Sequence, residues 1–205
     1  MAADLSNTYV NTLAVGPNDE NVSLQVSTTG GVMFNGSSKP ITTDIEASNG
    51  VVHTIDKVML PPNIVTLALN NPNFSILVQA LTDGRHQADF VAILNAAGPY
   101  TVFAPTNAAF EALLASNPSW NSLADIPIET LAAVLSYHVL ASANVQSNQL
   151  TNNQEITMFS GGKLTVDLTN GAMLKTSSNQ MVNISVVDVQ GTNGVIHGID
   201  SVLLP

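Results

Sequence analysis

One segment of the chain occurs twice, once before residue 62 and once at the carboxy terminus. The segment 49–61, NGVVHTIDKVMLP, returns as 193–205, NGVIHGIDSVLLP, with most positions identical. The likeness extends backwards with small gaps, so that residues 24–26 (LQV) answer residues 164–166 (LTV). Self-similarity of this kind indicates two copies of one structural unit. The two copies therefore share a carboxy-terminal half.

The two copies differ in length. Nothing in residues 1–61 answers the region from 63 to about 144. Two prolines, Pro61 and Pro62, mark the boundary, and their fixed φ angles favour an extended joint. We therefore predict that residues 1–61 are the carboxy-terminal β half of a preceding module and that residues 62–205 are a complete domain. An isolated β half leaves an apolar face bare, so we expect it to dock on the complete domain through β contacts. Self-association, or a boundary imposed by the ends of the sequence, is the alternative.

The spacing of apolar residues changes once along the complete domain. Spacing of three and four predicts helices over about 64–68, 74–81, 89–94, 106–114 and 131–137, with one buried strand at 100–104. After residue 144 the spacing becomes two, which predicts strands separated by Gly and Asn turns. A helical half followed by a strand-rich half is typical of the α+β class. The half copy, which keeps only the strand part, should be nearly all β.

Composition restricts the partners of the chain. Only 10% of the 205 residues are charged, and 15 acidic against 5 basic residues give a net charge of −10. Such a chain repels phosphate backbones, so we expect no nucleic acid partner. The absence of cysteine excludes disulfides and thiolate sites. No apolar run has the length of a membrane span, and the first residues lack a signal-peptide pattern, so we expect a cytosolic protein or the mature part of an exported one.

The segment 101–110, TVFAPTNAAF, reads as a strand-to-helix corner. Thr101 and Phe103 lie in a buried strand, and Pro105 ends it. Thr106 is a candidate cap for the following helix, on which Phe110 returns to the core. The main role of this motif is therefore structural.

The repeated ending also has a physical interpretation. Asn193 and Gly194 both tolerate positive φ, so they predict a tight turn into the last strand. Alternation places His197 among β-branched neighbours, where it should be a hydrogen-bonded core residue. Asp200 is expected to end the strand rather than to act as a base.

Together these motifs resemble the fasciclin domain family. The segment 101–110 resembles the first fasciclin signature, Tyr137 and His138 resemble the central Tyr-His motif, and 193–205 resembles the second signature. The resemblance implies a fasciclin-like α+β fold, with a helical amino-terminal half packed on a β-sandwich-like wedge. One departure is that Ala108 and Ala109 follow Asn107, where many relatives carry an acidic residue.

The resemblance also implies candidate partner-binding residues. In relatives, a Tyr-His motif flanked by aliphatic residues has been proposed as a surface for integrin-type receptors, and here it corresponds to Tyr137 and His138. A second proposed element is an Asp-Ile pair before the second signature. It corresponds to Asp44 and Ile45 in the half copy, and to Asp188 and Val189 in the complete domain. A buried Tyr-His motif binds only after opening.

The function implied by the family is adhesion. We expect an extracellular or cell-surface module that makes weak, multivalent contacts with a cell-surface or matrix protein, or with itself. Carbohydrate or surface-polymer binding is the alternative, with Trp120 or Tyr100 as an aromatic platform. The four histidines lack metal-ligand spacing, and there is no phosphate loop or dinucleotide fingerprint. We therefore expect no catalytic site, no metal site and no cofactor.

Overall fold

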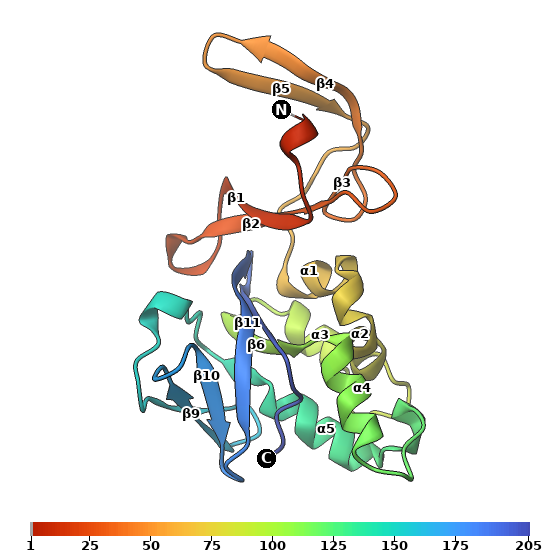
Figure 1. Cartoon of the computed structure of the whole chain (residues 1–205), viewed down its shortest axis with the longest axis vertical. Helices are drawn as coiled ribbons and strands as arrows, with labels where there is room; N and C mark the ends of the chain where they lie inside the picture. The colour runs from red at the N-terminus through yellow and green to blue at the C-terminus, as the bar shows by residue number, and fades with distance from the viewer. Residues whose placement is uncertain (1) are drawn as a thin grey trace.

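The computed structural model describes residues 2–205 and separates a strand-rich first part from a mixed second part (Figure 1). The first part begins with a 3-10 turn at Ala2–Asp4. The strands β1 (Thr8–Val15), β2 (Asn21–Ser27) and β3 (Met33–Phe34) then form one sheet, and β4 (Pro40–Ala47) and β5 (Gly50–Ile55) form a separate hairpin.

The second part, residues 62–205, has five α-helices and one seven-stranded sheet; it is the proposed complete domain, and residues 2–61 are the proposed half copy. The helices are α1 (Ile64–Asn70), α2 (Ser75–Leu81), α3 (Phe90–Asn95), α4 (Asn107–Ala115) and α5 (Ile128–Tyr137). The strands are β6 (Tyr100–Pro105), β7 (Val139–Ala141), β8 (Glu155–Thr157), β9 (Lys163–Asp167), β10 (Met173–Thr176), β11 (Met181–Gly191) and β12 (Gly194–Ile199). Their order is β7-β6-β12-β11-β10-β9-β8, with β12 parallel to β6 and all other neighbours antiparallel. The expected α+β class is confirmed.

Side chains at the helix starts explain why the helices begin where they do. Asn63, Asp89 and Thr106 each accept a hydrogen bond from the backbone N–H three residues further on. Such N-caps satisfy a backbone donor that has no partner inside the helix. The cap expected at Thr106 is confirmed.

Alternation along β6 divides the core in two. Val102 and Ala104 pack against α1, α2 and α3, whereas Phe103 points to the other side of the sheet. There it joins Tyr137 and the apolar side chains of β8, β9 and β10. Because successive strand residues face opposite sides, one short strand serves both clusters.

The two copies fold the repeated segment in the same register. Ile45 pairs with Val52, and Val189 pairs with Ile196. Every pairing between β4 and β5 recurs between β11 and β12 at residue numbers higher by 144, including both register shifts. The sequence repeat is therefore also a repeat of backbone geometry.

The copies differ in how β4 and β11 join the preceding strands. In the complete domain β10 pairs with β11 through contacts that include Leu174 with Val182. The first copy keeps one isolated bridge, between Phe34 and Ser38. Only residues 35–37 separate these two positions, against residues 175–181 in the second copy. The shorter connection prevents β3 and β4 from lying side by side, and the β4–β5 hairpin projects away from the complete domain (Figure 1).

The sheet formed by β1, β2 and β3 docks on the complete domain. The backbone N–H of Gln190 donates to Ser23 Oγ at 3.0 Å, and Asn71 Nδ2 donates to the Tyr9 hydroxyl at 2.7 Å. Gly16 passes so close to Gly191 that an added Cβ would lie 2.5 Å from its carbonyl oxygen. Docking therefore occurs, but through side chains and close backbone packing rather than through strand pairing between β1–β3 and the main sheet.

Candidate functional site

The Tyr-His motif lies inside the complete domain. The Tyr137 hydroxyl donates to Lys163 O at 2.5 Å, and His138 Nδ1 lies 2.7 Å from Val134 O. The backbone N–H of Leu203 donates to His138 Nε2 at 2.9 Å, so the ring carries its proton on Nδ1. Burial lowers the pKa of His138 to about 4. The motif therefore links the end of α5 to the last residues of the chain, and both ring nitrogens of His138 form hydrogen bonds.

The pair Asp188 and Val189 is also engaged in the fold. His197 Nε2 donates to Val145 O at 2.9 Å, which leaves Nδ1 to accept from the Asp188 N–H at 3.3 Å. Burial lowers the pKa of His197. The Asp188 carboxylate accepts from the backbone and hydroxyl of Ser147 at 2.7 and 2.5 Å. Val189 is buried in the core.

The equivalent pair in the half copy lies at the surface. The Asp44 N–H donates to His53 Nδ1 at 3.1 Å, as Asp188 does to His197, and both aspartates have φ of 60°. Ile45, unlike Val189, is 42% exposed. Of the two Asp-aliphatic pairs, only Asp44 and Ile45 therefore present an apolar side chain to a partner.

The remaining signature residues make internal contacts. Thr101 Oγ1 donates to Ala143 O and accepts from the Val145 N–H, both at 2.9 Å. Phe103 and Phe110 are buried, and β6 ends at Pro105. The Asp200 carboxylate accepts from the backbone and the side chain of Asn183 at 3.0 and 2.6 Å. All of these contacts lie within the complete domain.

The predicted tight turn before the last strand is present but lies one residue earlier than expected, and of the two residues Asn193 and Gly194 only Gly194 has positive φ, at 159°. Gly191 pairs with Gly194, so Thr192 and Asn193 form the turn, and Asn193 is not among the residues with positive φ. Its side chain instead accepts from the Ile64 N–H at 3.1 Å and donates to Leu94 O and Ala96 O, both at 2.8 Å. At Gly194 an added Cβ would lie 2.2 Å from Tyr100 O. Asn193 therefore links the β11–β12 turn to the start of α1 and the end of α3, and Gly194 lets β12 lie close to β6.

A buried amide network lies beside this turn and was not predicted. Gln190 Nε2 donates to Asn144 Oδ1 at 3.1 Å and to Gly194 O at 3.0 Å, while its Oε1 accepts from Gln146 Nε2 at 2.6 Å. Its members come from distant segments and have no common spacing in the sequence. Polar residues of this kind are indistinguishable from surface residues until the fold buries them.

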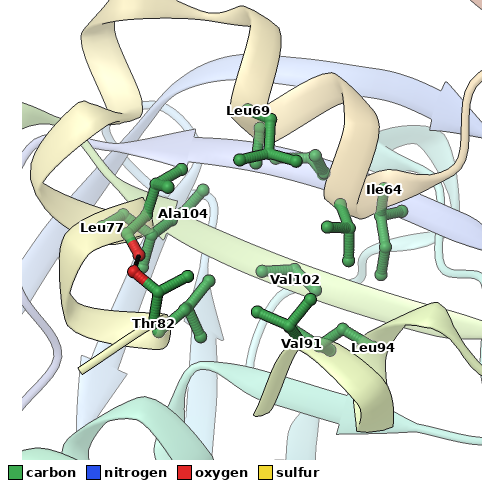
Figure 2. Close-up of a pocket in the computed structure, with 13 residues that line it drawn as sticks. Ile64, Leu69, Leu77, Thr82, Val91, Leu94, Val102 and Ala104 are labelled. Atoms are coloured by element: carbon green, nitrogen blue, oxygen red, sulfur yellow. Dashed lines mark hydrogen bonds between the residues drawn. The ribbon is translucent and has the colours of Figure 1, made fainter. Parts of the chain in front are cut away.

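An apolar cavity of about 140 Å³ lies between α1, α2, α3 and the sheet (Figure 2). Ile64, Leu77, Leu94 and Val102 are among its lining residues. The Thr82 hydroxyl, drawn in Figure 2, donates to Val78 O at 2.9 Å. The cavity therefore offers no charge to a bound molecule, and its size suits an apolar group no larger than about one six-membered ring.

The aromatic residues named for sugar binding pack against the helical core. Trp120 and Tyr100 are both partly buried there, and the Tyr100 hydroxyl donates to Ile93 O at 3.0 Å. A sugar platform requires an exposed ring face, so these positions do not favour the carbohydrate alternative.

The His, Asp and Glu side chains of residues 2–205 are dispersed. No group of three or more His, Asp or Glu side chains in that range is placed to hold a metal ion. Within the same range no single helix is long and apolar enough to cross a membrane. The bent pair Ile64–Asn70 and Pro72–Leu81 reaches that length and apolar composition only when its two helices are taken together.

Known proteins resemble the chain in sequence and in fold. A family model described as Fasciclin domain matches residues 1–61 and 72–205. An uncharacterized protein of Synechocystis is 36% identical over 143 residues, which cover 70% of this chain and 98% of that protein. Rabbit transforming growth factor-beta-induced protein ig-h3 is 34% identical over 158 residues, which cover 76% of this chain and 21% of that protein. A solved FAS1 domain pair from the insect cell adhesion molecule fasciclin I matches with a TM-score of 0.62 at 18% identity, over 96% of this chain and 67% of that one.

Proposed function

Because this chain belongs to the fasciclin domain family, we propose that it is an extracellular adhesion or matrix-attachment module that acts through weak, repeated protein contacts. The similar fold of a domain pair from an insect cell adhesion molecule supports this class of function. Several weak contacts joined in one assembly raise the overall affinity through effective concentration. The proposed module therefore needs an accessible contact surface rather than a deep pocket.

The exposed Ile45, which follows the half-buried Asp44, is the observation that carries this proposal. It lies on β4 at a register shift, where Asp44 has positive φ and Ile45 points its side chain into solvent. Of the other candidate positions, Tyr137, His138 and Val189 are buried, and the Asp188 carboxylate is bonded to Ser147. An apolar side chain beside a carboxylate on a projecting hairpin is suited to a small protein contact.

The same placements support binding without catalysis. A general base needs a ring nitrogen or carboxylate within reach of a substrate. Both ring nitrogens of His138 and His197 instead contact backbone groups. The apolar cavity has no ionisable group in its lining.

Cell attachment to a surface coated with the chain tests the proposal. The chain is displayed either singly or on a tetrameric carrier, and attachment is counted against coating density. We expect stronger attachment to the tetramer, and a loss of about tenfold for Ile45→Lys, since a contact of this size contributes about 1.4 kcal/mol. Leu13→Lys is the matched control, because Leu13 is 97% exposed on the other hairpin. If cells attach equally to the unmodified chain, to Ile45→Lys and to Leu13→Lys, the proposal is wrong.

A further inference from the structure

The half copy presents the same surface on which helices pack in the complete domain. We infer that the outer edge of β5, together with Asn49 and Met59, is a docking site for the helical half of a second fasciclin module. The internal repeat carries this inference, because the same sequence occurs once covered and once uncovered within one chain. It does not depend on the adhesion proposal, since it concerns the packing of the fold alone.

The first part of the docking site is a strand edge. In the complete domain β12 is held between β11 and β6, and it pairs in parallel with β6 from Gly194 opposite Tyr100 to Ile199 opposite Pro105. In the half copy the strand pairing described for β5 is with β4 alone. An open strand edge is a template for a further strand. The strand that the repeat specifies runs parallel to β5.

The second part is the apolar face around this edge. Val52 is 52% exposed, whereas its equivalent Ile196 is 2% exposed. Val58 is 88% exposed, whereas its equivalent Val202 is 3% exposed. Ile196 and Val202 both belong to the core cluster that contains the side chains of α1, α2 and α3. Within residues 2–61 the half copy therefore exposes the side chains that the complete domain uses to hold its helical cover.

The third part is a set of polar anchors. Asn193 holds the first residue of α1 and the end of α3, whereas its equivalent Asn49 lies exposed at the hairpin turn. The Leu203 N–H binds the His138 ring at the end of α5, and Met59 stands at the position of Leu203. A partner must therefore supply a parallel strand, a helix start and a Tyr-His helix end in one arrangement. The helical half of a fasciclin module has all three.

The space between the two sheets of the half copy is also consistent with a core that lacks part of its cover. An open cavity of about 390 Å³ lies between the two sheets of the half copy, and Val10, Phe34, His53 and Met59 are among its lining residues. Docking of a helical half would also bury Ile45, as it buries the equivalent Val189. Helical docking and the proposed adhesive contact at Ile45 are therefore mutually exclusive.

A tethered helical half tests the inference on the full chain. Residues 62–144 are copied in front of residue 1 through a flexible glycine-serine linker, which brings the effective concentration to about the millimolar range. Amide hydrogen exchange of residues 51–55 is then measured with and without the added segment. We expect protection to increase by about 100-fold or more, as for strands that become covered on both edges.

Two variants of the tethered protein identify the surface. Val52→Lys places a charge where Ile196 is buried, and it should abolish the gain in protection. Thr43→Lys is the matched control, because its equivalent Val187 stays 44% exposed in the complete domain, and it should keep the gain. In the chain without the added segment, Val52 is already half exposed, so Val52→Lys should leave the hairpin folded. No gain in the tethered protein, or a gain that survives Val52→Lys, would overturn the inference.

Discussion

At the scale of single residues, Asn49 and Asn193 show how one sequence position acquires two roles. Both occupy the second residue of the turn between repeated strands. Asn193 makes three hydrogen bonds to α1 and to the end of α3, whereas Asn49 is exposed. The contribution of this side chain to stability is therefore set by the helices around it and not by the turn.

The two asparagines allow a matched pair of substitutions. Asn193→Ala leaves one backbone donor and two carbonyl oxygens without their partner, so we expect the free energy of unfolding to fall by about 2–4 kcal/mol. Asn49→Ala should change it by less than about 0.5 kcal/mol, as for ordinary surface positions. Denaturant titration of the three proteins measures both values. Equal losses for the two variants would contradict the role assigned to Asn193.

His138 makes the stability of the protein dependent on pH. Its pKa in the folded protein is about 4, below the ordinary value of 6.5, because the ring is buried. As the pH falls below 6.5 the unfolded chain takes up this proton first, so stability is full above pH 6.5 and declines towards pH 4. The shift corresponds to about 3 kcal/mol. His197, whose pKa is also lowered by burial, acts in the same direction.

His138→Asn isolates this effect, because asparagine does not titrate. Urea unfolding between pH 7 and pH 4 should give a flatter dependence for the variant than for the unmodified chain, whatever its absolute stability. The Asp83 carboxylate, whose pKa is lowered to about 2 by Arg85, affects stability mainly below this range. Parallel curves for the two proteins would show that another group is responsible.

At the scale of elements, the sequence predicted more about strands than about their assembly. The repeat implied that β4–β5 and β11–β12 are equivalent, and their registers agree residue by residue. It did not predict that the first copy splits into two sheets, because this depends on the short connection between Phe34 and Ser38. Nor did it predict the Gln190 network, whose members meet only after folding. Local periodicity determines elements, whereas loop length and distant polar contacts determine how they meet.

Tyr9 makes two of the contacts between the β1–β3 sheet and the complete domain. Its ring packs on the helical core, and its hydroxyl accepts from Asn71. Tyr9→Ala removes both contacts, so we expect limited proteolysis to cut residues 1–61 about tenfold or more faster, as local opening becomes easier. Tyr9→Phe keeps the apolar contact and should have a smaller effect. Unchanged cleavage of Tyr9→Ala would mean that other contacts hold the sheet in place.

At the scale of the whole molecule, the strands become more exposed to solvent from the complete domain to the β4–β5 hairpin. β12 is buried along its whole length and paired on both edges, whereas β2 is covered on the face that docks on the complete domain. β5 is mostly exposed. These three strands therefore occupy three different environments in one chain, although β5 and β12 are similar in sequence.

Native-state hydrogen exchange should resolve these environments within a single sample. Amides of β12 are expected to exchange only on global unfolding, because every opening of that strand also exposes α1, β6 and β11. Amides of β2 should exchange through undocking of the β1–β3 sheet, and those of β5 through fraying of an isolated hairpin, which is marginally stable in water. We expect protection of β5 to lie about a thousandfold or more below that of β12, although their sequences nearly coincide. Similar protection in both strands would show that the hairpin is already covered in solution, and the same measurement would locate the cover from the residues that are slowed.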